Sequence, residues 1–562
     1  MGIDFEGQNQ RRFDRTWGTD NRINGINNLN VNTARNQTIT LSNTLTYNKS
    51  FGDHNFTFLV GNETIKGDYY ALSSSQKNFP DQDASLTFLG NGTGLTLNSE
   101  GKSGNSLAAF FGKVDYDFND KYLVSATVRR DGSSRFGPDN RWGTFYAGSL
   151  GWRIDKEFFE DNATIDRWLF RVGYGSIGNQ EIGNYAYENI IGLNSYYPYG
   201  NVRTLGSSIA NYGNNKIKWE TSKQFNAGTD LELWNGKLGV SLDYFRKETS
   251  DMLMRQPLAA SVGQNAFVWT NNGTMLNSGF ELQVTHANSL GDFKYNVSAN
   301  AATLHNEVVR LNTAPIPAGA VGSTYLTLTE AGYPVGSFFI YEAEGIFQNT
   351  TQIFTHAYQG DNIQPGDVMY KDQDSNGVID GKDRKHIGSP IPKVTAGLNI
   401  SLGYKNWDMS LFFQGAYGQK VFSVINRDLE GFYRPFNVTE RYFENHWTGP
   451  GTSNEFPRAS WDASSNNNLF SSRFLEDASY TRLKNVQLGY RIPSETLKKY
   501  GFTNVRIYFS GTNLLTFTKF QGLDPEMTVS DNAKGTGDLA SGIDWGTYPA
   551  ARSYNLGVNI TF

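Results

Sequence analysis

Twelve consecutive residues, from Asp372 to Asp383, place oxygen atoms at the spacing of a calcium-binding loop, with Gly377 at the sharp turn. The predicted ligands are the side chains or carbonyls of Asp372, Asp374, Asn376, Val378, Asp380 and Asp383. In this interpretation Ca²⁺ or another hard cation is a structural cofactor that rigidifies the loop at 306–392. A solvated turn is the alternative, because Asp, Asn and Gly favour turns without any metal.

Other chemical motifs are weak. Gly173, Gly175 and Gly178 fit the dinucleotide-binding pattern, but the residues that follow read as a loop rather than as the helix that would hold a phosphate. The six histidines are scattered, and the chain has no cysteine. Zinc, thiol and nucleotide chemistry are therefore not expected, and we predict that the protein is not an enzyme.

Two aromatic-rich segments are candidates for contact with a sugar ring or a partner protein. Their residues are Tyr196, Tyr197, Tyr199, Phe432, Tyr433 and Arg434. Packing within loops, or a position in an aromatic belt at a membrane surface, is the alternative that we favour.

Composition narrows the class of protein. Hydrophobic residues make up 38% of the 562 residues and the mean hydropathy is -0.50, and no run approaches the ~18–20 apolar residues of a membrane helix. A helical membrane protein is therefore excluded. The net charge is -5 and no Lys/Arg cluster is present, so nucleic acid is not an expected partner. Aromatic residues at 14% and 59 glycines favour strands joined by turns.

The last nine residues alternate between apolar and polar side chains. Such a strand has an apolar face and a polar face, and an aromatic C-terminal residue is typical of the closing strand of an outer-membrane barrel. We expect the apolar face to contact lipid, and deletion of Phe562 to impair assembly. The apolar face consists of Tyr554, Leu556, Val558, Ile560 and Phe562.

Similar segments recur along the chain. The clearest are 108–118, 122–130, 238–244, 398–404, 407–413, 486–491 and 505–510. Their second faces carry charges such as Asp115, Asp243 and Arg506, which are costly in a dry core but not in a wet lumen. We predict an all-β, antiparallel transmembrane barrel with about sixteen strands in this chain.

Connections of two lengths join these strands. Tight turns are expected at 119–120, 234–237 and 404–406, and long loops at 71–105, 179–216, 306–392, 418–475 and 516–548. Alternation of short and long connections is typical of outer-membrane barrels, in which the long loops lie outside the cell.

Several segments resemble the SusC/RagA family over nearly the whole chain from about residue 100. They are Lys121–Pro138, Asn140–Phe145, Gly151–Ile154, Gly175–Gln180, the calcium-like loop with Ile387–Pro392, Ala478–Tyr490 and Asn513–Glu526. The resemblance implies a TonB-dependent transporter of the bacterial outer membrane, with a 22-stranded barrel, an N-terminal plug and a SusD-like surface lipoprotein as partner. It also implies import of oligosaccharides or peptides.

The chain resembles the barrel portion of such a transporter, because neither a plug, nor a TonB-contacting segment, nor a signal peptide is seen after Met1. We expect the missing parts to lie upstream. Two alternatives stay open. One is a self-contained passive porin, and the other is a soluble all-β enzyme or adhesin that acts on glycans.

Overall fold

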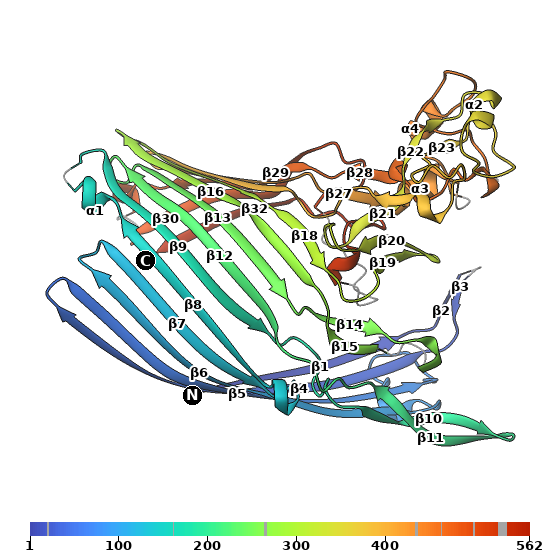
Figure 1. Ribbon diagram of the computed structural model, residues 1–562, viewed down its shortest axis with the longest axis horizontal. Coiled ribbons are helices and arrows are strands. Elements are labelled where there is room, and N and C mark those ends of the chain that lie inside the picture. The colour runs from blue at the N-terminus through green and yellow to red at the C-terminus, as the bar shows by residue number, and fades with distance from the viewer. Residues whose placement is uncertain are drawn as a thin grey trace. The chain divides into compact units, whose positions relative to one another are not determined.

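The computed structural model describes residues 1–562 except 20–21, 161, 263–266, 433–435, 462, 498–500, 527–536 and 562. Strands dominate the described residues (Figure 1). The α-helices are short: α1 (Asp155–Phe158), α2 (Thr350–Thr355), α3 (Val424–Glu430), α4 (Glu440–Asn445) and α5 (Ser494–Leu497). Within the described part of the chain, no helix combines the length and the apolar character needed to cross a membrane.

Two compact units share the chain. The first comprises Met1–Leu150, Gly173–Lys223 and Thr249–Asn272, and the second comprises Gly151–Val172, Gln224–Glu248 and Gly273–Phe562. Four strands contain residues of both units: β8 (Trp142–Arg153), β9 (Ile165–Asn179), β12 (Glu220–Leu233) and β13 (Leu238–Ser250).

The first unit is built on a continuous antiparallel ladder in the order β1, β4, β5, β6, β7. These strands are β1 (Gly2–Asp14), β4 (Asn28–Phe51), β5 (His54–Lys77), β6 (Leu97–Phe118) and β7 (Tyr122–Ser133). The turn between β6 and β7 holds Asn119 and Asp120 at φ of 53° and 51°. Asn and Asp tolerate this left-handed conformation, which matches the twist of a hairpin, so the predicted tight turn is confirmed.

The second unit contains the ladder β16, β17/β18, β25, β26, β29, β30, β32. Its strands are β16 (Thr274–Leu290), β17 (Phe293–Thr303), β18 (His305–Arg310), β25 (Val394–Tyr404), β26 (Trp407–Tyr417), β29 (Tyr480–Arg491), β30 (Asn504–Thr518) and β32 (Ser553–Thr561). Every pairing in this ladder is antiparallel, and neighbours in the chain are mostly neighbours in the sheet.

The strand prediction agrees with this architecture. The large antiparallel ladders include seventeen of the described strands, and β17 and β18 both pair with β16 as one strand interrupted at Leu304. Sixteen long strands therefore result among the described residues. The tight turns at 234–237 and 404–406 are also confirmed, since β12 ends at Leu233 and β26 begins at Trp407.

β32 shows the expected alternation. It pairs with β30 in the register Leu556 to Phe509 and Val558 to Ile507, so apolar side chains of both strands share one face. That face is open, because Leu556 is 79% exposed and Tyr554, Val558 and Ile560 are exposed as well. Phe562 lies outside the described residues. Large apolar side chains left open in rows on strands are what lipid contact requires.

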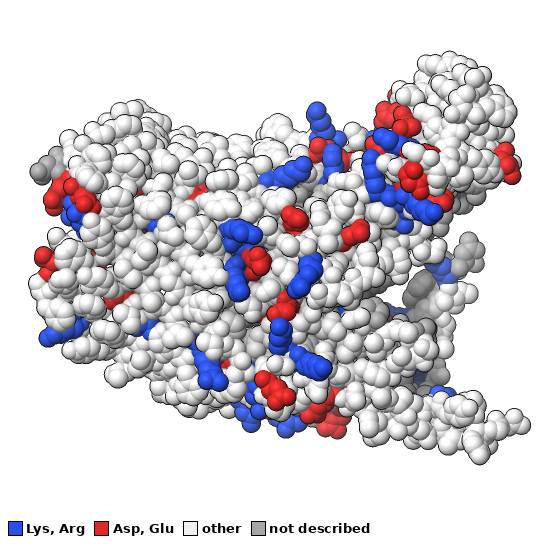
Figure 2. Space-filling view, viewed as in Figure 1, with Lys and Arg blue, Asp and Glu red and all other residues white. Residues whose placement is uncertain are grey.

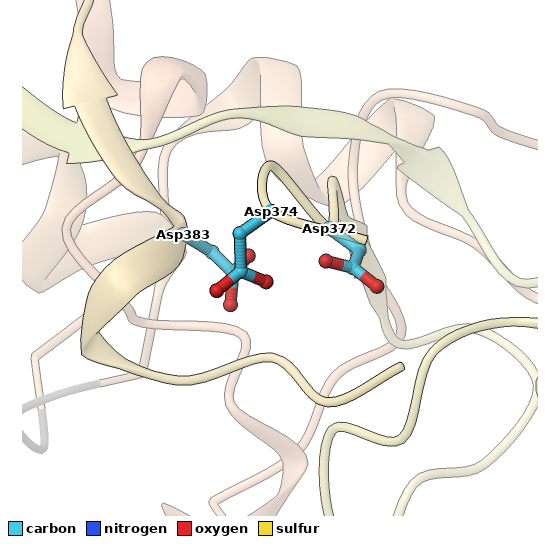
Figure 3. Close-up of side chains that lie close together, drawn as sticks. All are labelled: Asp372, Asp374 and Asp383. Atoms are coloured by element: carbon cyan, nitrogen blue, oxygen red, sulfur yellow. The ribbon is translucent and has the colours of Figure 1, made fainter. Parts of the chain in front are cut away.

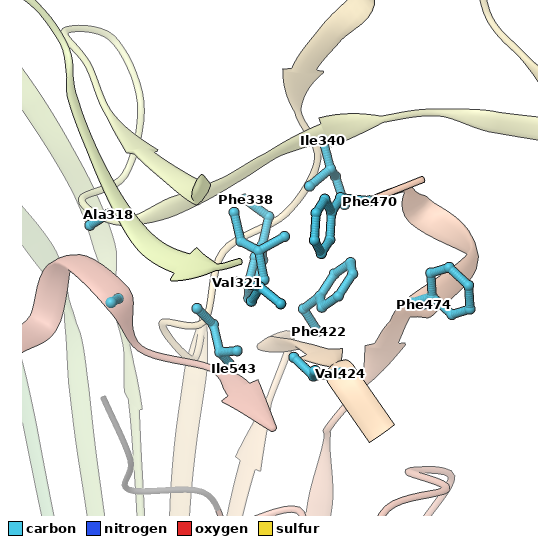
Figure 4. Packing of buried hydrophobic residues seen from close by; sticks show 11 residues of the cluster. Ala318, Val321, Phe338, Ile340, Phe422, Val424, Phe470, Phe474 and Ile543 are labelled. Carbon is cyan, nitrogen blue, oxygen red and sulfur yellow. The ribbon is translucent and has the colours of Figure 1, made fainter. Parts of the chain in front are cut away.

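The long connections of the second unit contain ordered structure that periodicity did not predict. Their strands are β19 (Ile316–Val321), β20 (Thr324–Thr329), β21 (Ser337–Tyr341), β22 (Ala343–Ile346), β23 (Val368–Tyr370), β24 (Arg384–His386), β27 (Lys420–Ser423), β28 (Leu475–Asp477) and β31 (Ile543–Asp544). Phe338, Phe422 and Ile543 come from three different connections and pack in one buried cluster (Figure 4). We call residues 306–392, 418–475 and 516–548, where described, the loop domain.

Two predicted loops of the first unit differ from the structure in different ways. The 71–105 loop is wrong at both ends, because β5 continues to Lys77 and β6 already begins at Leu97. The 179–216 loop contains the hairpin of β10 (Ile190–Tyr199) and β11 (Val202–Asn211). Polar residues at the end of β5 and the start of β6 concealed the extent of these strands, since strands that pass beyond a membrane need no apolar face.

An arginine on the open face of β32 tests its contact with lipid. We expect Leu556→Arg to lower the stability of the assembled protein by about 2–4 kcal/mol, as charged side chains do near the middle of a bilayer. The measurement is the folded fraction in urea after assembly into lipid vesicles. Asn555→Arg is the matched control on the opposite face, and equal losses for the two variants would contradict the assignment of faces.

Candidate functional site

The polar faces of the strands carry charged side chains that meet across the ladder. In the second unit, Arg171 of β9 donates to Asp230 of β12 at 2.8 Å and to Asp243 of β13 at 2.7 Å. Ser241 donates to Asp230 at 2.5 Å. The side chains of the three charged residues are 19–38% exposed, so they are paired while still in contact with water. Asp243 lies on the face that the sequence predicts to be polar.

A second group joins three consecutive strands of the same unit. Arg506 of β30 donates to Asp408 of β26 at 2.9 Å and to Gln487 of β29 at 3.1 Å. The sequence places each of these residues on a polar face, and the ladder brings them together. The register is therefore fixed by side chains as well as by the backbone, because a slip of one strand by one residue would turn its member of the group to the apolar face.

The first unit repeats this arrangement. Arg129 of β7 donates to Asp131 at 2.8 Å and to Glu63 of β5 at 3.0 Å. Ser125 donates to Asp115 at 2.7 Å, and Lys113 forms an ion pair with Asp115 at 2.8 Å. The polar faces thus offer hydroxyls, amides and paired charges.

Paired charges give a surface that is polar without a strong field of one sign. Figure 2 shows Lys and Arg beside Asp and Glu in small mixed groups on the face in view. Such a surface suits a hydrated neutral solute, because it offers many hydrogen bonds but little net attraction to an anion or a cation.

The calcium-like loop lies in the loop domain and brings three of its predicted ligands together. Carboxylate oxygens of Asp372, Asp374 and Asp383 all lie within 4.8 Å of one another (Figure 3). Asp383 is fully buried, and its two oxygens accept from the backbone of Gln373 at 2.8 Å and of Asp380 at 2.7 Å. Backbone donors therefore hold Asp383 in place, one from the opposite arm of the loop and one from the turn that Asp383 ends.

Asp372 leaves one oxygen without a donor. Its Oδ2 accepts from the backbone of Gly377 at 2.8 Å, and this hydrogen bond lowers the pKa of the Asp372 carboxyl. Its Oδ1 is shielded from solvent and has no hydrogen-bond partner. An ionised, unpartnered oxygen beside two further carboxylates is the donor set that a hard cation takes. Of the residues described, no basic side chain forms an ion pair with Asp372, Asp374 or Asp383.

The other predicted ligands serve the loop itself. Asn376 accepts from the backbone of Val378 at 2.8 Å and donates to Asp374 at 3.0 Å. Asp380 accepts from the backbone of Lys382 at 2.7 Å. These bonds form a turn that can exist without metal. The assignment of Asn376, Val378 and Asp380 as metal ligands accordingly stays a prediction.

The aromatic segments have different surroundings. Tyr196, Tyr197 and Tyr199 lie in β10, where they are 53–78% exposed, and the Arg203 guanidinium stacks on Tyr196 at 3.8 Å. Phe432 instead packs within the loop domain, where its ring lies 5.3 Å from that of Tyr442. Tyr433 and Arg434 lie outside the described residues.

The glycines of the dinucleotide-like pattern lie in a strand and not in a turn that opens a helix. Gly173, Gly175 and Gly178 all lie within strand β9, and the next element along the described chain is strand β10. A phosphate therefore has no helix N-terminus to bind.

Two buried charge clusters of the second unit escaped sequence reasoning. Asp367 is fully buried and accepts from Arg458 at 2.7 Å and from Asn467 at 3.0 Å. Arg482, also buried, donates to Asp524 and to Glu526 at 2.5 and 2.6 Å. The residues of the second cluster lie in Ala478–Tyr490 and Asn513–Glu526, two segments that resemble the SusC/RagA family. This resemblance is the only feature of the sequence that points to the second cluster. The first connects residues that are 91 positions apart and has no local pattern.

Removal of Arg458 tests how much the loop domain depends on the first cluster. We expect Arg458→Met to destabilise it by about 3–5 kcal/mol, because the buried Asp367 carboxylate loses its counter-charge. Hydrogen exchange of the 364–370 backbone is the measurement. Lys385→Met, which breaks a half-exposed pair with Glu342, is the control and should cost about 1 kcal/mol or less. Similar exchange in the two variants would contradict the assignment.

Comparisons with known proteins place the chain in a family. Residues 2–514 match the family described as TonB dependent receptor-like, beta-barrel. The chain is 34% identical to TonB-dependent receptor P3 of Formosa agariphila over 94% of its own length and 53% of the relative's. It is 29% identical to TonB-dependent receptor SusC of Bacteroides thetaiotaomicron over 82% of its length and 44% of the relative's. The chain thus spans about half the length of the curated relatives that it matches.

A solved structure shares the fold. The RagAB peptide transporter superposes on 100% of this chain and 59% of its own, with a TM-score of 0.84 and 24% identity. This likeness agrees with the antiparallel ladders, the short turns and the folded loop domain. The chain therefore belongs to the TonB-dependent receptor β-barrel family, as a barrel of the SusC/RagA type.

Proposed function

We propose that the chain forms the wall, lumen and outer loops of a transporter that imports oligosaccharides across the outer membrane. Energy would come from TonB through a part of the protein that precedes this barrel portion, and a SusD-like surface lipoprotein would deliver the substrate. Peptides are the second substrate class, since the similar RagAB structure is named a peptide transporter. The relatives are named receptors, which favours transport over catalysis.

The observation that carries this proposal is the pairing of charges on the polar strand faces. Arg171 with Asp230 and Asp243, and Arg506 with Asp408, leave a wetted surface that is rich in hydrogen-bonding groups. A neutral oligosaccharide carries many hydroxyls, so it gains hydrogen bonds on such a surface without a charge mismatch. A soluble glycan-acting protein would not need the open apolar face of β32.

Uptake by cells tests the proposal. In a strain that expresses the full-length receptor with its lipoprotein, we expect a fluorescent neutral oligosaccharide to accumulate only while TonB is functional. A fluorescent peptide of similar mass is the comparison for substrate class. Accumulation that persists without TonB would support a passive porin and overturn the proposal, and preferred uptake of the peptide would overturn the substrate class.

We further propose that the loop around Asp372 binds Ca²⁺ and thereby stiffens the loop domain. Asp372, Asp374 and Asp383 would supply carboxylate oxygens, and the carbonyl of Val378 is a further candidate ligand. Support comes from the Oδ1 of Asp372, which has no hydrogen-bond partner, and from the lowered pKa of this carboxyl. The lowered pKa keeps the carboxyl ionised at a lower pH than is usual for an aspartate. The alternative is the Asx-rich turn that holds itself together.

Calorimetric titration of the purified protein with CaCl₂ separates the two interpretations. We expect saturable binding that Asp372→Asn abolishes, together with slower hydrogen exchange across 372–383 when Ca²⁺ is bound. Asp361→Asn is the matched control, because Asp361 lies in the same loop but bonds to Tyr358. If CaCl₂ produces no heat of binding, or if the two variants bind Ca²⁺ equally, the loop is an Asx-rich turn and not a Ca²⁺ site.

A further inference from the structure

A pocket opens on the outward face of the first unit, away from the polar wall. It has a volume of about 470 Å³ and is lined by residues of β5, β6, β7, the start of β8 and the 179–189 segment. Most of its strand residues, including Lys66 and Ser106, have the same alternation as the apolar residues Phe58 and Val114, which pair across β5 and β6. The pocket therefore lies on the side of the wall that carries the lipid-facing residues.

Aromatic residues indicate where this pocket lies relative to the lipid tails and headgroups. On β7 the outward residues run from Tyr122 through valines to Arg130, nine positions that match the 9–11 residues of a tilted membrane strand. Trp142 lies at the far end of this span, where its ring stacks on Phe110 at 6.3 Å and the Arg130 guanidinium covers it at 5.5 Å. Trp residues of this kind occupy the boundary between lipid tails and headgroups.

The pocket begins at this boundary and extends beyond it. Phe110 pairs with Asn62, whereas the pocket residues Lys66 and Asp68 lie four and six positions farther along β5. β5 itself continues to Lys77 on the side of the long connections, which is the outer side in this family's architecture. The pocket is thus level with the headgroups of the outer leaflet.

The lining combines cations, aromatic faces and small polar groups. Lys66 and Arg141 supply positive charge, and Asp68 supplies one negative charge that is 3.6 Å from Lys66. The lining also includes the rings of Trp142, Tyr185 and Tyr187 and the small polar residues Asn105, Ser106 and Ser134. Aromatic rings and hydroxyls beside two cations suit a sugar that carries a phosphate.

Arg141 is the residue of the lining that favours a phosphate ligand. Its Nε is shielded from solvent and has no hydrogen-bond partner. Arg141 lines the pocket, and a ligand that supplies anionic acceptors to the terminal N–H groups of its guanidinium would be favoured there. Phosphate oxygens are the acceptors that a guanidinium binds best, since both groups can form two parallel hydrogen bonds.

We propose that this pocket binds the phosphate monoester of an outer-leaflet lipid headgroup, with Arg141 and Lys66 as the phosphate-binding residues. The assignment rests on the outer-membrane placement proposed above. The lipid tails would lie along the open apolar face of β6 and β7, and the headgroup would enter between Trp142 and Tyr185. A lipid held there would be a fixed part of the wall and not a transported substrate.

The chain offers a clean probe of this pocket because it contains no cysteine. Ser106→Cys places a single thiol at an exposed lining position, to which an environment-sensitive fluorophore can be attached. The labelled full-length protein is assembled into phosphatidylcholine vesicles with and without phosphatidic acid. We expect a fluorescence change only with phosphatidic acid, and roughly tenfold weaker binding after Arg141→Gln, as expected for one lost charge-assisted bond.

Arg35→Gln is the matched control. Arg35 lies on the same outward face, stacks on Tyr70 at 5.5 Å and does not line the pocket. The proposal is overturned if the two arginine variants bind phosphatidic acid equally. It is also overturned if inorganic phosphate displaces the signal, which would identify a free anion, or if the signal follows protein concentration, which would identify a second copy of the chain.

Two further measurements separate lipid binding by Arg141 from a structural role of this residue and from the proposed transport function. Arg141→Gln should leave the thermal stability unchanged in vesicles of phosphatidylcholine alone, because the Arg141 Nε has no partner within the protein. Oligosaccharide uptake should also continue in this variant. A loss of stability without lipid would make Arg141 a structural residue and overturn the proposal.

Discussion

The need to satisfy every backbone amide within a lipid bilayer governs this structure. Water cannot reach those groups, so each strand must pair along its whole membrane length. The antiparallel ladders from β1 to β7 and from β16 to β32 meet this requirement. Once the backbone is fixed in this way, side chains alternate strictly, and one face is left for lipid while the other is left for water.

The two faces then follow different energetic rules. Apolar residues such as Leu556 gain stability only from lipid, which explains why they stay open on the isolated chain. On the polar face, Arg171 and Arg506 each join acidic partners on other strands, so their charges neither repel one another nor attract a single class of ion. Register, charge pairing and the proposed preference for a neutral solute thus have one common origin.

The loop domain is stabilised as a soluble protein is. Phe338, Phe422 and Ile543 form a buried core from three separate connections, and the Asp367–Arg458 pair joins segments far apart in the sequence. This packing gives the calcium-like loop a rigid base, since Asp383 is buried and held by two backbone donors. Loops that must keep a binding surface in place need such support.

Local pattern alone determined the alternating strands of the large ladders, their polar and apolar faces and the tight turns, because each depends on neighbours one or two positions away. It also placed Asp372, Asp374 and Asp383 in one loop, and the family motifs identified the barrel type. Only the tertiary structure revealed the ordered loop domain, the Asp367–Arg458 pair and the pocket that Arg141 and Lys66 line. These features join residues that lie tens of positions apart, and no periodicity connects them. Burial and hydrogen-bond satisfaction are properties of the folded chain, so they could not be predicted from the order of residues.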